Sequence, residues 1–242
     1  MELKPIRTRE RDFRGNYDAT TPAPDYAVTG DGQKVLRNTY LLLAATMVPT
    51  VIGAWIGVQF APVMMAHPIL SLVLMLGSVI GLQFAIVAYR NSGVGVGLLL
   101  LMTGLMGVFL GPLLNVALEM RNGMQLVGYA ALGTGAIFLA MGAAAHRIKR
   151  DLSFMGKFLF VGMIALLIAI FANAFLQIPA LALTISTLVI VVFSLYLVYD
   201  LQRIIRGGET NYVLATTGVY ISLLNIFSNL LYLLLALSGD RD

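Results

Sequence analysis

The chain has 242 residues, of which 59% are hydrophobic and only 12% are charged. Soluble domains carry about twice that charged fraction, so this chain cannot build a water-facing shell around a core, and its surrounding solvent must be lipid. The net charge of +4 does not indicate nucleic-acid binding, because the basic residues lie mostly in short clusters between apolar runs.

The first 38 residues form a polar segment in which arginines mix with acidic residues, prolines and glycines. Such a composition buries too little apolar surface to fold by itself. We therefore expect a disordered cytoplasmic N-terminal tail over residues 1–38, followed by a transmembrane domain over residues 39–242.

Seven apolar runs follow this tail. A bilayer core about 30 Å thick needs roughly 20 apolar residues in a helix, and each of these runs is long enough. The sequence thus predicts an all-α, polytopic membrane protein with seven transmembrane helices, in which Pro49 and Pro112 should kink the first and third. The runs are Thr39–Phe60, Pro68–Tyr89, Gly93–Leu118, Met124–Ala145, Phe154–Phe175, Ile178–Tyr199 and Tyr212–Leu237.

The distribution of lysine and arginine indicates the orientation, because cytoplasmic loops hold the excess of these residues. With seven spans, the opposite side receives only Arg121 and Arg241. The N-terminus is therefore expected in the cytoplasm and the C-terminus on the far side. The basic residues on the cytoplasmic side are Lys4, Arg7, Arg9, Arg11, Arg14, Lys34, Arg37, Arg90, Arg147, Lys149, Arg150, Arg203 and Arg206.

Glycines spaced four residues apart occur in the first three runs, and this spacing lets helix backbones approach closely in a membrane. A compact bundle within one chain is the interpretation that we favour, and a seam between two copies is the alternative. The pairs are Gly53 with Gly57, Gly77 with Gly81, and Gly107 with Gly111.

Asp200 is an acidic residue close to the interior of a helical run on the cytoplasmic side. Arg203 follows one turn later, at a spacing that permits an ion pair. Asp200 is thus either an interfacial carboxylate paired with Arg203 or a titratable gate or ion ligand.

The last run carries a polar stripe, because Ser222, Asn225 and Asn229 recur at spacings of three and four and share one helix face. Such a face belongs in the bundle interior. It either bonds to neighbouring helices or lines a polar path, for which Asp200 would supply the charge.

Motifs of known enzymes are not found. The two histidines do not form a zinc-protease motif, and neither a nucleophile elbow nor a phosphate-binding glycine loop occurs. Without cysteine, thiolate metal sites and iron–sulfur clusters are excluded. We expect no enzyme activity, no cofactor and no resident metal.

Six stretches in loops and helices resemble, in their order, the Bax-inhibitor family of transmembrane proteins, and within it the bacterial YccA branch. The resemblance covers residues 34–242. The stretches are KVLRNTY (34–40), LGPLLN (110–115), DLSFMG (151–156), NAFLQIPAL (173–181), GGETNY (207–212) and VYISLLNIF (219–227).

This resemblance implies a fold in which the last helix is central and is surrounded by the other six. It also implies residence in the bacterial inner membrane and modulation, by inhibition, of the membrane-anchored, ATP-dependent protease FtsH. That protease would grip the N-terminal tail.

Other bacterial members of the family resemble pH-sensitive calcium leaks, in which one aspartate of the sixth helix and one of the seventh share a proton. Asp200 matches the first position, whereas Ser222 stands at the second. Two close carboxylates hold a proton because both cannot comfortably ionise, and a serine removes that effect. A Ca²⁺ leak is therefore the alternative function.

Reporter fusions test the predicted orientation. A reporter placed after Asp242 should register the non-cytoplasmic side of the membrane, whereas one inserted in the His146–Asp151 loop should register the cytoplasm. A cytoplasmic C-terminus would contradict the topology of seven spans.

Overall fold

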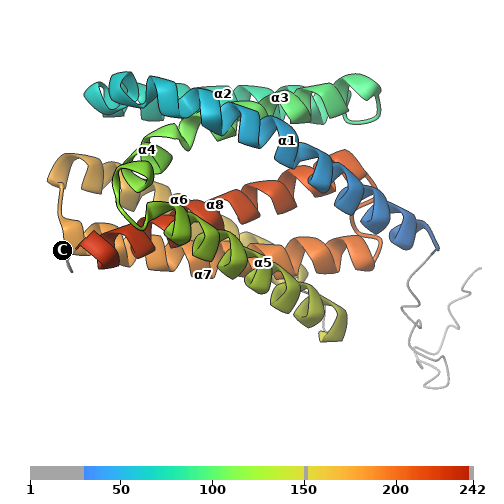
Figure 1. Cartoon of the computed structure of the whole chain (residues 1–242). Coiled ribbons are helices and arrows are strands. Elements are labelled where there is room, and N and C mark those ends of the chain that lie inside the picture. Colours follow the sequence, from blue (N-terminus) through green and yellow to red (C-terminus); the bar gives the residue numbers. More distant parts are fainter. Residues whose placement is uncertain (1–29, 150–151, 240–242) are drawn as a thin grey trace, which may run out of the picture.

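A computed structural model describes residues 30–149 and 152–239, and these residues form an all-helical fold (Figure 1). Apolar, strongly helix-forming runs account for the helices, and short polar or glycine-containing breaks separate them. The helices are α1 (Gly30–Ala66), α2 (Pro68–Tyr89), α3 (Gly93–Phe109), α4 (Gly111–Glu119), α5 (Gly123–Arg147), α6 (Ser153–Leu176), α7 (Pro179–Ile205) and α8 (Tyr212–Gly239).

Seven membrane spans result when α3 and α4 are counted together. Six helices are long and apolar enough to cross a bilayer alone, and α3 with α4 forms a further span that bends by 40°. The bend lies at Leu110, immediately before Gly111 and Pro112. Proline lacks the backbone N–H that would continue the ladder, so the kink predicted at Pro112 is confirmed and the predicted count of seven spans holds.

The first helix begins earlier than the sequence predicts. α1 starts at Gly30 and continues to Ala66, passing through Pro49 and Pro62 without a break. Residues 30–38, which were expected to belong to the tail, are therefore helical. The remainder of the predicted tail, residues 1–29, lies outside the residues that the structure describes.

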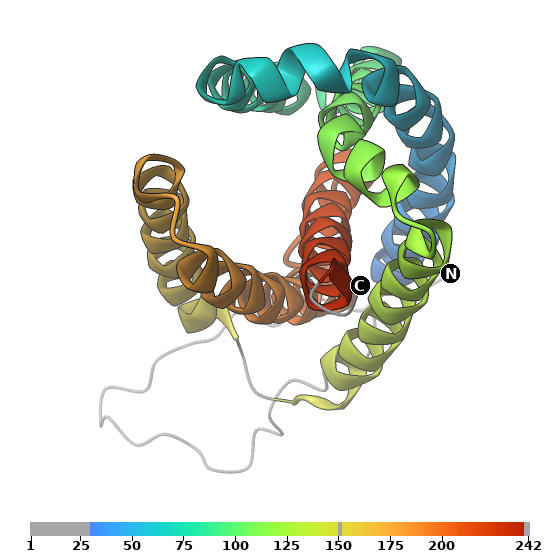
Figure 2. The ribbon, with the colours of Figure 1, turned by 60° about the vertical axis from the view of Figure 1, so that its left-hand side comes forward.

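The last helix occupies the centre of the bundle. α8 packs against α1, α3, α4, α5 and α7, with a smaller contact to α2, and Figure 2 shows it inside an arc made by the other helices. α6 stands outside this ring because it packs chiefly on α7, through Leu166, Ile185 and Val189. The expectation that six helices surround the last one is therefore met by all of them except α6.

Glycines join α1 to α3 and α4 by direct backbone contact. A Cβ at Gly53 would overlap the carbonyl oxygen of Gly104, and one at Gly57 would overlap that of Val108. Gly107 and Gly111 approach α1 in the same way. These two predicted glycine pairs thus serve packing within one chain.

The third glycine pair behaves differently. A Cβ at Gly77 or at Gly81 would meet nothing within 4 Å. Most of α2 is exposed, and Ile86 is its one buried residue. The same spacing therefore marks a contact in α1, α3 and α4, and an open helix face in α2.

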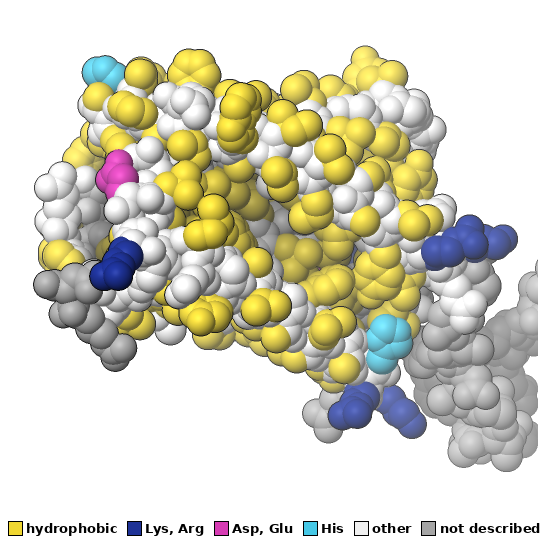
Figure 3. Space-filling view, in the orientation of Figure 1, with side chains coloured by type: hydrophobic (Ala, Val, Ile, Leu, Met, Phe, Trp, Pro, Cys, Tyr) yellow, Lys and Arg dark blue, Asp and Glu magenta, His cyan; other side chains and the backbone are white. Residues whose placement is uncertain are grey.

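The outer surface is apolar over most of its area, as expected where lipid replaces water. Large hydrophobic side chains are exposed on most of the long helices, including Trp55, Phe84 and Phe158. In the face seen in Figure 3, the charged side chains lie towards the ends of the molecule, and many apolar side chains are exposed between them.

Two alanine substitutions distinguish the glycine seam between α1 and α3, where Gly53 contacts backbone, from the open face of α2 that carries Gly77. Gly53→Ala should lower the free energy of unfolding by about 1–3 kcal/mol, the usual cost of overpacking, because the new methyl group meets backbone. Gly77→Ala, which enters open space, should leave stability unchanged or raise it slightly, since alanine is the better helix former. Titration with a denaturing detergent, followed by circular dichroism, measures both. Equal effects would contradict the seam.

Candidate functional site at the contact of α7 with α8

Asp200 lies near the C-terminal end of α7 and faces α8. A Cβ placed on Gly218 would lie 2.9 Å from Asp200 Oδ2. Asp200 as a whole is half-buried, and its carboxylate approaches the α8 backbone closely because residue 218 has no side chain. A glycine at this position of α8 is therefore what admits a charged group between the two helices.

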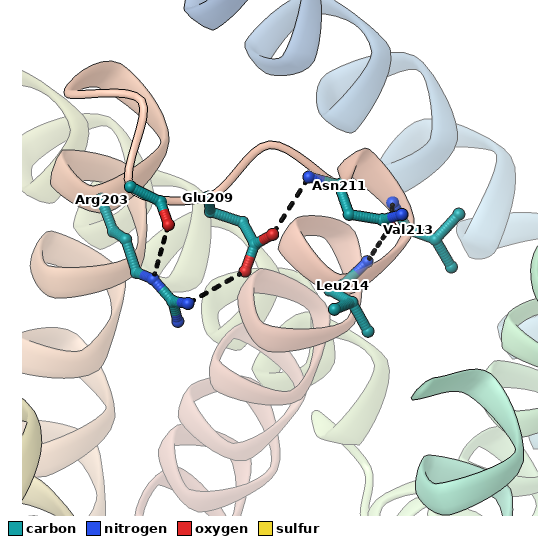
Figure 4. A network of polar contacts seen from close by, with 6 residues as sticks. Arg203, Glu209, Asn211, Val213 and Leu214 are labelled. Carbon is teal, nitrogen blue, oxygen red and sulfur yellow. Dashed lines mark hydrogen bonds and ion pairs between the residues drawn. The ribbon is translucent and has the colours of Figure 1, made fainter. Parts of the chain in front are cut away.

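Arg203 does not pair with Asp200. Its Nη2 lies 3.3 Å from Glu209 Oε2, and its Nε donates a hydrogen bond to the carbonyl oxygen of Gly208 (3.4 Å; Figure 4). Gly207 takes a positive φ of 73°, which turns the chain back, so that the N–H groups of Gly208 and Glu209 bond to the Arg203 carbonyl. The interpretation of Asp200 as the partner of Arg203 is therefore wrong, because this turn brings Glu209 to the guanidinium.

Asn211 caps α8 and joins two loops. Its Oδ1 accepts hydrogen bonds from the N–H groups of Val213 (3.0 Å) and Leu214 (3.1 Å), which satisfies donors that a helix start leaves free. Its Nδ2 donates to Arg90 O (2.9 Å) and Asn91 Oδ1 (2.8 Å) in the turn between α2 and α3. Asn211 was not among the predicted site residues. Its place immediately before an apolar run was the signal that would have identified it.

Gln202 ties the other end of this region to the connection between α5 and α6. Its Oε1 accepts from the Leu152 N–H (3.2 Å), and its Nε2 donates to Ile148 O (3.0 Å). Arg206 Nη2 donates to the same carbonyl (3.0 Å). The C-terminal turn of α7, which follows Asp200, is thus held by the backbone of the connection between α5 and α6.

Burial is uneven along the polar stripe of α8. Ser222 is buried, one turn along α8 from Gly218, whereas Asn225 and Asn229 are half-buried. The amide of Asn225 donates to Ile221 O (2.9 Å) and that of Asn229 to Asn225 O (2.8 Å). Within the described residues, these amides bond to their own helix and not to a neighbour.

A separate buried polar cluster joins α8 to α1 and α3, and the sequence analysis did not identify it. The Tyr220 hydroxyl donates to Thr103 O (3.1 Å) and lies 2.8 Å from Thr50 Oγ1. Because the Tyr220 hydrogen is used on Thr103 O, Thr50 Oγ1 is the donor to Tyr220, and Thr46 O (2.7 Å) is the alternative acceptor for the one Thr50 hydrogen. Nothing in the sequence indicates that the hydroxyl of a tyrosine within an apolar run contacts a threonine of α1.

The chemistry available at the contact of α7 with α8 is limited to one carboxylate beside neutral amides and hydroxyls. Among the described residues, no three acidic or histidine side chains gather as metal ligands. A lone carboxylate next to Ser222 can attract a cation or a proton, but it does not form a shared-proton pair.

Comparison with known proteins agrees with this architecture. The family model described as inhibitor of apoptosis-promoting Bax1 matches residues 32–240. An uncharacterized protein of Neisseria meningitidis is 40% identical over 221 residues, which cover 89% of this chain and 97% of that protein. An uncharacterized membrane protein of Vibrio cholerae is 38% identical over 206 residues, or 85% of this chain and 91% of the relative.

One similar protein carries a functional name. The Escherichia coli protein named modulator of FtsH protease YccA is 38% identical over 207 residues, covering 86% of this chain and 92% of its own length. The likeness thus extends over nearly the whole of both chains.

Proposed function

We propose that this chain, which belongs to the Bax-inhibitor family of membrane proteins, is a non-enzymatic inner-membrane protein that binds the membrane-anchored protease FtsH and restrains it. The observation that carries the proposal is the 38% identity, over 86% of the chain, to the Escherichia coli modulator of that protease. A regulator of this kind needs a stable bundle that persists while the protease engages it. The close α1 contacts and the loop ties to α7 and α8 are consistent with that requirement.

The orientation belongs to the same proposal. The N-terminus would lie in the cytoplasm, where an ATP-dependent protease acts, and the C-terminus in the periplasm. The polar segment that precedes α1 would then be the part that the protease grips, because extraction must begin at a segment that offers few apolar contacts.

Removal of the N-terminal segment tests the proposal. Deletion of residues 2–29, which ends where α1 begins, should slow degradation of the protein by the protease several-fold while leaving association with it intact. The shortened protein should then accumulate and inhibit cleavage of other membrane substrates more strongly. Pulse-chase labelling and co-purification from native membranes measure the two effects. Unchanged turnover of the shortened protein would show that the protease does not engage it through the N-terminal segment.

A calcium leak is the second candidate, and one observation favours it. Asp200 is not held by Arg203 and lies against Gly218, one helical turn from Ser222. The carboxylate is therefore available to a cation or proton at the contact of α7 with α8. Because position 222 holds serine, the unmodified protein lacks the second acid that a proton-sharing pair requires.

Substitutions at these two positions test the second candidate in liposomes. The unmodified protein should show little pH-dependent Ca²⁺ flux, and Ser222→Asp should create or strengthen it, because two close carboxylates cannot both ionise comfortably. Adding Asp200→Asn to Ser222→Asp should abolish the gain. Strong pH-dependent flux from the unmodified protein would place the leak ahead of protease modulation.

A further inference from the structure

We propose that the contact of α1 with α3, α4 and α8 is a mechanical lock that sets how slowly the protein is extracted from its N-terminus. This inference rests on the proposed function, because only a protease that pulls on the N-terminal segment acts on α1 before every other helix. The inference identifies the contact that resists the pull. Because slow extraction keeps the protease engaged with this chain, the same contact would explain why other substrates are cleaved less.

The order of the chain makes α1 the first helix to leave. A pull from the N-terminus reaches Gly30 first and then draws α1 lengthwise past its neighbours. After the buried Gly32, the first buried side chains on this path are those of Thr39, Leu42 and Leu43, and α1 becomes free only when the contacts beyond them have broken. The resistance of α1 is therefore encountered before any contact among α5, α6 and α7 is tested.

The glycine seam resists sliding because its contacts are between backbones. The Gly53 and Gly57 backbones touch Gly104 and Val108 so closely that a single methyl group would overlap them. Moving α1 along α3 by one residue replaces glycine with a larger side chain at each contact. The helices must therefore separate before α1 can slide, and separation in lipid loses close van der Waals contacts that apolar burial does not restore.

The buried hydroxyl cluster adds to the seam. Thr50 and Tyr220 are almost fully buried, and their hydrogen bonds link α1 to α8 and α3. Extraction of α1 leaves the Tyr220 hydroxyl without its Thr50 partner inside the membrane, where water is absent. This cluster thus connects the first helix to the central one.

Contacts elsewhere in the bundle provide a contrast. α6 packs chiefly on α7 through a small apolar cluster that includes Leu166. Weakening that cluster lowers the stability of the whole fold but does not touch α1. The lock therefore predicts that two destabilised variants respond differently to extraction, according to where the weakened contact lies.

The decisive comparison is Tyr220→Phe against Leu166→Ala, in liposomes that contain the purified FtsH protease and ATP. Tyr220→Phe removes the hydroxyl and keeps the ring, and it should speed loss of the full-length chain about threefold, the size expected for one interhelical hydrogen bond in a membrane. Leu166→Ala should leave that rate unchanged although it destabilises the fold. Tyr232→Phe, for which the described structure gives no hydroxyl bond, is the matched control and should also leave it unchanged.

A disulfide supplies the opposite test. A Cβ at Gly104 would lie 3.6 Å from Pro49 Cβ, within the range found in disulfides, and the chain has no other cysteine. In the double variant Pro49→Cys with Gly104→Cys, oxidation should slow extraction at least about tenfold and strengthen inhibition of a second substrate. Addition of a reductant should restore the rate of the same variant, which serves as its own control.

Force measurements separate failure of the lock from failure of the proposed function. The protein is held in a bilayer and pulled from its N-terminus without protease, and Tyr220→Phe should shorten the lifetime of the first unfolding step about threefold. If the protease neither binds nor degrades the protein but this lifetime shortens, the lock stands and the proposed function fails. If Tyr220→Phe and Leu166→Ala change the lifetime and the degradation rate alike, the lock is overturned.

Discussion

Close backbone contact between α1 and the bent span of α3 and α4 is the constraint on which the remaining arrangement depends. Lipid tails are as apolar as leucine, so burial of apolar side chains gives helices little reason to associate in a membrane. Van der Waals contact between closely packed backbones supplies the attraction instead, and glycine permits the shortest distance between two helices. Gly53, Gly57, Gly107 and Gly111 bring the two spans together, and the break at Pro112 lets α4 follow the second half of α1.

The position of α8 follows from this pair. With α1 and α3 in contact, Thr50 and the Thr103 carbonyl lie close enough for the Tyr220 hydroxyl to reach both. The start of α8 is then fixed by Asn211, which caps the helix and binds the turn after α2. A central helix held at its start and along its length presents Gly218 to α7, and this is what positions Asp200 between the two helices.

The sequence alone was sufficient for the number of spans, because apolar runs of sufficient length and the proline at position 112 are local signals. It was not sufficient for the direction of the glycine faces. Gly53 with Gly57 and Gly77 with Gly81 share one spacing, yet the first pair meets α3 and the second meets nothing. Which face of a helix is covered depends on neighbours distant in the chain, and a single sequence does not record them.

The same dependence on neighbours that lie elsewhere in the chain explains which parts of the candidate site could be predicted from the sequence. The stripe of Ser222, Asn225 and Asn229 was identified because helical periodicity is local, whereas the pairing of Asp200 with Arg203 was wrong because it ignored the loop. Spacing of three residues permits an ion pair, but Gly207 in the left-handed region folds Glu209 back onto Arg203. The ion pair of Arg203 is therefore with Glu209, and Asp200 faces α8.

The two candidate functions place opposite demands on this fold. A leak requires α7 and α8 to move apart at Asp200, whereas a restraint on a protease requires the helices to stay together under force. The contacts relevant to each function lie on different sides of α8. The α1 seam and the Tyr220 cluster lie on the side of α8 that faces α1 and α3, whereas Asp200 and Gly218 lie where α8 meets α7. α7 packs extensively on α8, so a leak would have to open one of the larger contacts of the bundle while leaving the α1 contacts closed. The two functions therefore place their load on different sides of α8.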